Sequence, residues 1–396
     1  MELPIPYGRQ TITDSDIEAV VETLRSPYLT QGPRIAEFER AFARYVGAPY
    51  AVAVNNATAG LHIAAAALGV APGKKVIVTP LTFAASANCI RYCGGEVVFC
   101  DIDPDTRLMD AGRLEEIINA HPAGTFAGIV AVDFAGYPHN LEQFREIADR
   151  HGLWIIEDAC HAPGAWFTAA DGERHFSGSG RFADCSVFSF HPVKHIATGE
   201  GGMVTTANPE IYARLLSLRS HGITRDPELL HENHGGWYYE MQELGFNYRI
   251  TDIQAALGLS QLSRAEEGLA RRRRIADRYD EALRNEPGIT IPYRNDSVGH
   301  AFHLYVIEVD DRPGDTPGTA RRSLYDFLRG ADILAQVHYV PVHLMPYYRE
   351  LGSAPGDCPV AERYYTRCLS LPMFPALTDE QQQYVIDKVK EWNASR

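Results

Sequence analysis

Short apolar segments alternate with longer segments of helical periodicity from about residue 35 to residue 260. The short segments are rich in Val, Ile and Phe, whereas the longer ones repeat Ala and Leu at helical spacing. This alternation is typical of parallel strands joined by crossover helices. The predicted strands cover residues 50–54, 75–80, 97–100, 128–132, 154–157, 185–190 and 202–206. The sequence therefore predicts an α/β fold with a mostly parallel central sheet, in which ligands bind at the carboxyl ends of the strands.

The pattern changes after residue 262. We expect a loop at residues 310–319, where Asp, Gly and Pro gather. The elements expected around it are a charged helix at 263–276, strand-like AFHLYVIEV, a helix near 320–328, strand-like AQVHYV and two terminal helices. A chain of 396 residues is long enough for two cores. We therefore predict a large domain over residues 1–262 and a smaller C-terminal α+β domain over residues 263–396.

Charge and hydropathy exclude several classes of function. The formal net charge of −14 argues against nucleic-acid binding, which depends on clustered Lys and Arg. The one basic run, Arg271 to Arg274, falls in a helical pattern and is expected to form a solvated helix face. No apolar run is long enough to cross a bilayer, and the N-terminal residues do not resemble a signal peptide. We expect a cytoplasmic protein without a membrane partner.

Cysteine and histidine spacing predicts neither a disulfide framework nor a metal site. The chain has seven cysteines, an odd number. Cys89 and Cys93 have no second pair nearby, and the spacing of His221, His231 and His234 matches no common set of zinc ligands.

One lysine stands apart from the other basic residues. Only five of the 37 basic residues are lysines, and the other four lie in charged or terminal segments. Lys194 follows an apolar strand and precedes a glycine-rich turn. Because arginine cannot lose its proton, a lysine at such a place indicates that a deprotonated amine is needed, and Schiff-base chemistry is the usual reason.

Other candidate site residues follow predicted strands. Glu157 and Asp158 end the segment WIIED, and only one of them can face a site because side chains alternate along a strand. That carboxylate could hold a heterocyclic nitrogen protonated, although a structural ion pair is equally compatible. The helix start at NNATAGLHIA could bind a phosphate or be an ordinary capped helix. Phe83 could stack on a flat ring or lie in the core.

These segments together resemble the DegT/StrS sugar aminotransferases. The resemblance is carried by EDACHA, FSFHPVK, GEGG, LRSHGI and ELGFNYRITDIQAALGLSQL, and extends from LTQGPRIAEFER to VHYVPVH. It implies the aspartate-aminotransferase-like fold (fold type I) of enzymes that depend on pyridoxal 5′-phosphate (PLP). It further implies a homodimer with shared active sites.

The resemblance also implies a role for each matching residue. Lys194 would form the Schiff base, Asp158 would pair with the pyridine nitrogen, Phe83 would stack on the ring, and His161 would lie beside the phenolic oxygen. The phosphate would be held by Ala57, Thr58, Ser189 and, across the dimer, Asn247. The positions implied around the sugar nucleotide are Tyr7, Pro27, Tyr28, Leu29, Thr30, Ala57, Ser189, Asn247, Val337, His338, Tyr339 and Val340.

The implied reaction moves the amino group of L-glutamate to C4 of a UDP-linked 4-keto-6-deoxy-N-acetylhexosamine. The alternatives are an aminotransferase for another nucleotide-linked 3- or 4-keto sugar and a PLP-dependent sugar dehydratase. In the dehydratase a histidine replaces the lysine, whereas Lys194 is present here. The chain departs from the family pattern in a long 168–180 segment and in NNAT, where Ser-Gly-Thr is commoner.

Overall fold

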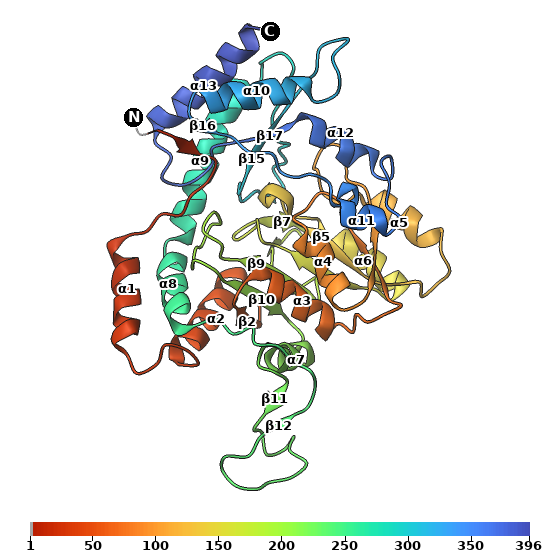
Figure 1. Cartoon of the computed structure of the whole chain (residues 1–396), viewed down its shortest axis with the longest axis vertical. Coiled ribbons are helices and arrows are strands. Elements are labelled where there is room, and N and C mark those ends of the chain that lie inside the picture. The colour runs from red at the N-terminus through yellow and green to blue at the C-terminus, as the bar shows by residue number, and fades with distance from the viewer. Residues whose placement is uncertain (1–2) are drawn as a thin grey trace.

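The computed structural model describes residues 3–396, and within them a seven-stranded sheet forms the centre of the molecule (Figure 1). Strand β10 is antiparallel to both neighbours, and the other pairs are parallel. In spatial order the strands are β2 (Tyr50–Val54), β10 (Gly202–Thr206), β9 (Cys185–Ser189), β6 (Trp154–Asp158), β5 (Phe126–Val132), β3 (Lys75–Val78) and β4 (Glu96–Phe99). All the predicted core strands are present, and the predicted fold class is confirmed.

Helices cover both faces of this sheet, which is why its strands are apolar on both sides. On one face Val78 and Val187 pack with α3 (Ala57–Ala67), α4 (Ala85–Tyr92) and α7 (Pro209–Arg219). On the other face Ile129 and Ile155 pack with α5 (Ala111–Asn119) and α6 (Leu141–His151). In a third core cluster, Phe42 of α2 (Pro33–Val46) packs against Phe188 of β9.

The N-terminal helices fold against the helix that closes the large sheet region. Helix α1 (Asp14–Arg25) packs along α8 (Asp252–Leu262). The backbone N–H groups of Gly32 and Arg34 donate to the buried carboxylate of Asp252 at 2.7 and 2.9 Å. This contact joins the start of α2 to the start of α8.

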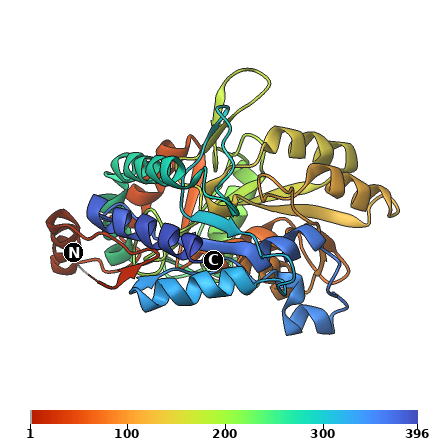
Figure 2. The same cartoon turned by 90° about the horizontal axis from the view of Figure 1, so that it is seen from above.

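A separate core lies beyond residue 262. Its sheet pairs β15 (Tyr305–Val309) with β13 (Ile289–Thr290) and β17 (Cys368–Leu371). The helices around it are α9 (Ala265–Leu283), α10 (Thr319–Gly330), α11 (Pro346–Glu350), α12 (Pro359–Arg367) and α13 (Asp379–Ala394), with α10 and α13 side by side (Figures 1 and 2). Strand β1 (Ile5–Pro6) pairs with β16 (Ile333–Leu334), so Ile5 belongs to this core. The boundary at residue 262 stays a prediction, but the first strand of the chain packs with the C-terminal region.

Two expectations for the C-terminal region are wrong. Segment 335–340 is not a strand: in the described chain Gln336 forms an isolated bridge with Ser370. The segment instead leaves the small sheet, and the N–H of Val342 donates to the carbonyl of Pro80 at the end of β3. The described chain also has three α-helices after residue 340 rather than two, because a short α11 precedes the two longer ones.

The basic run on α9 is less solvated than expected, because Arg271 and Arg273 are half-buried and Arg272 is buried. Arg272 is 1 % exposed, and its Nη1 donates to the carbonyls of Phe302, His303 and Met373. Arg274 is exposed, as expected. The helical period turns one residue of the run inward, where backbone carbonyls replace water around the guanidinium group.

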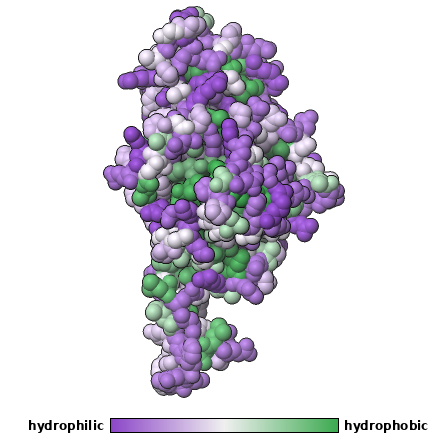
Figure 3. Space-filling view, turned by 90° about the vertical axis from the view of Figure 1, so that its right-hand side faces the viewer, coloured by the Kyte–Doolittle hydropathy of each residue, from purple (hydrophilic) through white to green (hydrophobic). Residues whose placement is uncertain are grey.

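Two hairpins extend from the large region. Strands β7 (Trp166–Thr168) and β8 (Arg174–Phe176) form a hairpin that includes the first part of the long 168–180 segment, and β7 also pairs with β14 (Val298–Gly299). Strands β11 (Ile223–Thr224) and β12 (Glu240–Met241) begin an arm over residues 223–241 that projects from the molecule (Figures 1 and 3). No helix within residues 3–396 is long and apolar enough to span a membrane.

Candidate active site

A cavity of about 560 Å³ opens at the carboxyl ends of β5, β6 and β9. Residues from both regions line it, because Tyr7 and segment 338–339 approach the large sheet here. The predicted site residues that line the cavity are Tyr7, Ala57, Thr58, Phe83, Asp158, His161, Ser189, Lys194, His338 and Tyr339. The predicted residues that lie outside it are Pro27, Tyr28, Leu29, Thr30, Asn247, Val337 and Val340. Ten of the predicted residues thus line one cavity, and the site assignment itself stays a prediction.

Asp158 is the last residue of β6 and is 5 % exposed. Its Oδ2 accepts a hydrogen bond from Ser86 Oγ at 2.6 Å, and its Oδ1 accepts one from the Cys160 N–H at 3.1 Å. Ser86 Oγ also lies 2.6 Å from the hydroxyl of Thr82. These donors fix the carboxylate at the cavity wall, where it can pair with a protonated ring nitrogen.

Glu157 points to the opposite face of the sheet. Its Oε2 accepts hydrogen bonds from the Gly178 N–H at 2.9 Å and from Ser186 Oγ at 2.5 Å. Burial, and then the neighbouring carboxylate of Asp133, raise the pKa of Glu157 well above its usual range. Strand alternation therefore leaves Asp158 as the carboxylate of this pair that faces the cavity.

Lys194 lies in the turn after β9, with its Nζ 3.5 Å from Nε2 of His303. Burial lowers the pKa of the Lys194 amine to about 8, although Cys160 and Asp158 oppose this shift. The positive charge of Arg272 adds to the lowering. An amine with this pKa is partly deprotonated near neutral pH, as a nucleophile or base requires.

His161 is held as a neutral imidazole of one tautomer. The backbone N–H of Ala135 donates to His161 Nδ1 at 3.2 Å, so Nδ1 is an acceptor and the proton lies on Nε2. Nε2 is 3.2 Å from the hydroxyl of Tyr339 and donates to it. Burial lowers the pKa of His161 well below its usual range, with a further contribution from Lys194.

The N-terminus of α3 forms an anion cradle beside these groups. Asn56 caps the helix by accepting from the Ala59 N–H at 2.8 Å, while the N–H groups of Ala57 and Thr58 belong to the first turn and have no partner within the helix. Gly202 approaches this turn so closely that a Cβ there would lie 2.7 Å from the Ala57 nitrogen. Ser189 pairs with Gly202 across β9 and β10. The cradle suits a phosphate group.

Phe83 is not a core residue, since 63 % of its surface is exposed. Its ring lies at the cavity, 6.4 Å from the ring of Tyr339. An aromatic face left open here can stack on a flat heterocycle.

Sequence reasoning missed several residues of the site. Ser86 lies three residues after Phe83 among small residues with no distinctive pattern, and His303 lies within an ordinary strand pattern. Both contacts join residues far apart in the chain, which a single sequence does not reveal. The cavity is also lined by Asn56, Cys160, His191 and Glu200, none of which was predicted.

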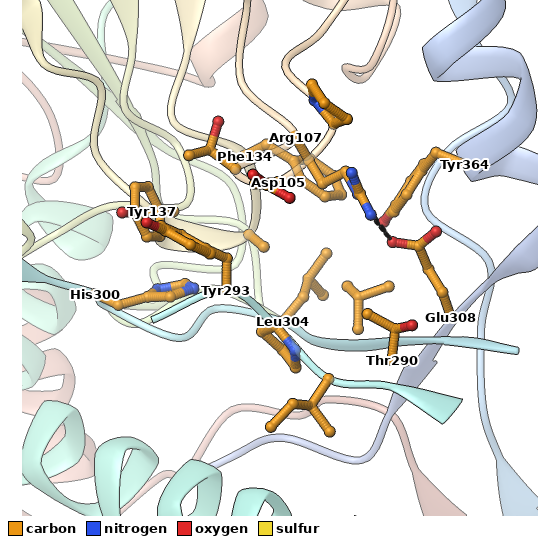
Figure 4. Close-up of a pocket in the computed structure, with 16 residues that line it drawn as sticks. Asp105, Arg107, Phe134, Tyr137, Thr290, Tyr293, His300, Leu304, Glu308 and Tyr364 are labelled. Carbon is orange, nitrogen blue, oxygen red and sulfur yellow. Dashed lines mark hydrogen bonds and ion pairs between the residues drawn. The ribbon is translucent and has the colours of Figure 1, made fainter. Parts of the chain in front are cut away.

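A second cavity, of about 130 Å³, lies between segment 104–107 and the small sheet (Figure 4). Arg107 forms an ion pair with Glu308 in it, and Tyr137 and Tyr293 form part of its wall. Its lining has neither a lysine nor a helix N-terminus of the kind found at α3. The cavity around Lys194 is therefore the candidate active site.

The residues around Lys194 fit PLP. The amine matches the aldehyde of the cofactor, and the facing carboxylate matches its pyridine nitrogen. The exposed aromatic ring matches the face of the cofactor ring, and the cradle at α3 matches its phosphate. Together with the sheet order, this site defines a fold type I PLP-dependent transferase.

The chain belongs to the DegT/DnrJ/EryC1/StrS aminotransferase family, whose sequence profile matches residues 10–390. It is thus a PLP-dependent sugar aminotransferase. The chain is 38 % identical to the spore coat polysaccharide biosynthesis protein SpsC of Bacillus subtilis, over 98 % of this chain and 96 % of that protein. It is 37 % identical to the GDP-perosamine synthase of Caulobacter vibrioides, over 97 % of both. The solved structure of Helicobacter pylori PseC, an aminotransferase involved in the biosynthesis of pseudoaminic acid, matches with a TM-score of 0.88 and 30 % identity, over 99 % of this chain and 100 % of that one.

Proposed function

We propose that the protein transfers the amino group of L-glutamate to C4 of a UDP-linked 4-keto-6-deoxy-N-acetylhexosamine. The products are 2-oxoglutarate and UDP-4-amino-4,6-dideoxy-N-acetyl-β-L-altrosamine, a step of pseudaminic acid biosynthesis. The observation that carries the aminotransferase chemistry is the cavity that brings Lys194 together with Asp158 and the start of α3. The likeness to PseC supports the choice of substrate.

In this proposal the cofactor supplies an electron sink, and the chain supplies orientation and proton transfer. Asp158 keeps the pyridine nitrogen protonated, and its two hydrogen-bond donors hold its carboxylate in place. Lys194 Nζ removes the proton from Cα of L-glutamate in the first half-reaction. In the second, it delivers a proton to C4 of the sugar. His161 remains neutral and offers its Nε2–H at the side of the cavity near Tyr339.

We further propose a homodimer in which each active site uses residues of both subunits. Asn247 is exposed and lies outside the cavity of its own chain, although the family resemblance gives it a phosphate contact. Apolar side chains are exposed on and next to the projecting arm (Figure 3): they are Leu229, Trp237, Met241 and Leu244. Such exposed apolar surface favours burial against a second copy. In the dimer, residues 27–30 and Asn247 would complete the sugar-nucleotide site of the partner.

A second substrate has support of its own. The likeness to a GDP-perosamine synthase favours a GDP-linked 4-keto-6-deoxy sugar. The two proposals share the reaction at C4 and differ in the nucleotide and in the N-acetyl group.

The test is a direct competition between the two substrates. Purified enzyme with PLP is incubated with ¹⁵N-labelled L-glutamate and equal amounts of the UDP-linked and GDP-linked 4-keto-6-deoxy sugars, and the products are identified by mass spectrometry. We expect the ¹⁵N label in the UDP-linked product. Label in the GDP-linked product alone would replace the first substrate with the second. Lys194→Ala is the control and should give no labelled sugar.

A further inference from the structure

His303 contacts the amine of Lys194 from the C-terminal region of the chain. Its side chain is buried, and its Nε2 lies 3.5 Å from Lys194 Nζ. We propose that His303 is a positioning residue that holds the Lys194 amine away from Asp158 whenever this amine is not covalently engaged. The inference rests on the proposed function of Lys194 as the amine that binds the cofactor.

Packing fixes the ring of His303 and leaves one polar contact for it. Its ring centroid is 4.3 Å from that of His161 and 5.8 Å from that of His195. Its backbone carbonyl accepts a hydrogen bond from buried Arg272 at 3.2 Å. Among the residues that the structure describes, Nδ1 of His303 is buried without a hydrogen-bond partner. A buried imidazole normally has both nitrogens satisfied, but among the described residues the contact with Lys194 is the one hydrogen bond of this ring.

A neutral ring suits this task. Burial, followed by the charge of Lys194, lowers the pKa of His303 well below its usual range. A neutral imidazole can accept from the protonated amine through Nε2, and in its other tautomer it can donate to the deprotonated amine. His303 can therefore hold Lys194 in both protonation states without adding a charge to the cavity.

The competing partner of the amine is Asp158. An ammonium group released from His303 is attracted to this carboxylate, and pairing with it would raise the pKa of Lys194 and occupy the group proposed for the pyridine nitrogen. The titratable and charged groups around the Lys194 amine come from six segments of the chain. They are Asp158, Cys160, His161, His195, Arg272, His303, His338 and, at the cavity wall, Tyr7, His191, Glu200 and Tyr339.

Two amide substitutions of His303 distinguish the roles of its two ring nitrogens. In His303→Gln the side-chain amide nitrogen reaches about as far as Nε2, whereas in His303→Asn it reaches only as far as Nδ1, the nitrogen without a partner. Each full-length protein is freed of cofactor and mixed with PLP in a stopped-flow spectrophotometer over a range of pH. The rate of covalent capture reports the fraction of deprotonated amine. The wild-type rate should rise with pH around a midpoint near 8.

We expect His303→Asn to move this midpoint upward by about 0.5 to 1 pH unit, because the freed ammonium pairs with Asp158. Capture at pH 7 should then be about 3- to 10-fold slower, while His303→Gln should behave like the wild type. In an Asp158→Asn background the effect of His303→Asn should vanish, as in a double-mutant cycle between coupled residues. His303→Leu, which lacks both nitrogens, should behave like His303→Asn and serves if the latter fails to fold.

A midpoint that stays constant or falls in folded His303→Asn or His303→Leu protein overturns the positioning role. So does an equal shift in the presence and absence of the Asp158 carboxylate. Borohydride reduction followed by peptide mapping separates this failure from failure of the proposed function. Label on a residue other than Lys194 refutes the function, whereas label on Lys194 with an unchanged midpoint refutes only the inference about His303.

Discussion

Ser86 Oγ donates a 2.6 Å hydrogen bond to Oδ2 of Asp158, across 72 positions of the chain. The hydroxyl of Thr82 lies 2.6 Å from the same Ser86 oxygen, so the carboxylate is held by a short relay of hydroxyl groups on the segment that begins α4. The contact joins the loop after β3 to the end of β6. Ser86 and the Cys160 N–H donate to different oxygens of the Asp158 carboxylate.

Ser86→Ala should lower kcat/KM by about 10-fold. A hydrogen bond to a charged group is worth about 1.5–3 kcal/mol, and the remaining N–H donor limits the loss to the lower end of that range. Steady-state kinetics with saturating PLP measures the effect. Thr82→Val is the matched control, because it removes the outer hydroxyl and leaves the Ser86 donor in place, and it should cost about 3-fold or less. Equal losses in the two variants would contradict a direct role for Ser86.

Asp158→Asn and Glu157→Gln should have unequal effects. Asn keeps the shape of Asp158 but cannot hold the pyridinium proton, so we expect a ~10- to 100-fold loss of kcat or more. Glu157 lies on the other face of the sheet, where an amide oxygen can still accept from Gly178 and Ser186. Its substitution should change kcat by less than about 3-fold. The reverse order would show that Glu157 is the cofactor's partner.

Asp133→Asn should change the pH dependence of stability. Burial raises the pKa of Asp133 from 3.8 to about 6, so its neutral form is favoured in the folded state. A raised pKa contributes stability that is fully present below pH 3.8 and is lost as the pH rises through about 6. The asparagine variant cannot ionise and should lack this loss.

Urea unfolding of wild type and Asp133→Asn between pH 4 and pH 7 tests this sign. The difference in unfolding free energy, wild type minus variant, should decrease with increasing pH. Asn can still accept from the His139 N–H, which donates to Asp133 Oδ1 at 3.0 Å, so the local turn should persist. A difference that grows with pH would mean that the folded state favours the charged carboxylate.

The fold was largely predictable because its strands are continuous apolar runs between helices. The predicted bounds of Tyr50–Val54 and Gly202–Thr206 agree with the structure at both ends. Segment 335–340 has the same apolar character and is not a strand, because pairing depends on a neighbour that a sequence does not display. The local sequence pattern therefore predicted the strands of the central sheet. It failed for segment 335–340, where tertiary contacts decide whether an apolar segment pairs as a strand.

The site was predictable only in part, for a related reason. Lys194 and Asp158 follow strands whose carboxyl ends meet at one edge of a sheet. His303 and Ser86 reach them from distant segments, and neither has a sequence setting that differs from ordinary structure. The buried Arg272 was assigned to a solvated face because its three arginine neighbours share its local pattern.

Arg272→Met should be strongly destabilising. The three carbonyls that accept from Arg272 Nη1 would lose a buried charged donor, at a cost of about 3–5 kcal/mol in unfolding free energy. Arg274→Met is the matched control on the same helix, and this exposed site should change stability by less than about 0.5 kcal/mol. Chemical denaturation measures both variants. A small effect at Arg272 would show that solvent or repacking satisfies the carbonyls.

The proposed dimer predicts that two defective subunits can restore activity to one another. Lys194→Ala removes the amine of a subunit's own site, whereas substitution of Asn247 is expected to damage the site of its partner. A mixed dimer then has one site with both faults and one site with neither. Random exchange makes about half of the dimers mixed, and each has one good site of two, so activity should recover to roughly a quarter of the wild-type value.

The Asn247 variant must be clearly defective for this experiment to be decisive. Asn247→Ala removes one hydrogen bond, worth about 0.5–1.5 kcal/mol, so Asn247→Asp, which places a negative charge near the phosphate, is the better choice. Subunit exchange is verified by native mass spectrometry with one parent isotopically labelled, and activity is measured before and after mixing.

As a control, Lys194→Ala is mixed with Asp158→Asn. The proposed arrangement places both of these residues in the active site of their own subunit. In that control each mixed dimer keeps one fault per site, so activity should not rise. Recovery with Asn247→Asp and none with Asp158→Asn is the expected pair of results, because only the first combination gathers both faults into one site. If exchange is complete and the Asn247 mixture is no more active than the sum of its parents, Asn247 acts within its own subunit and the shared site is refuted.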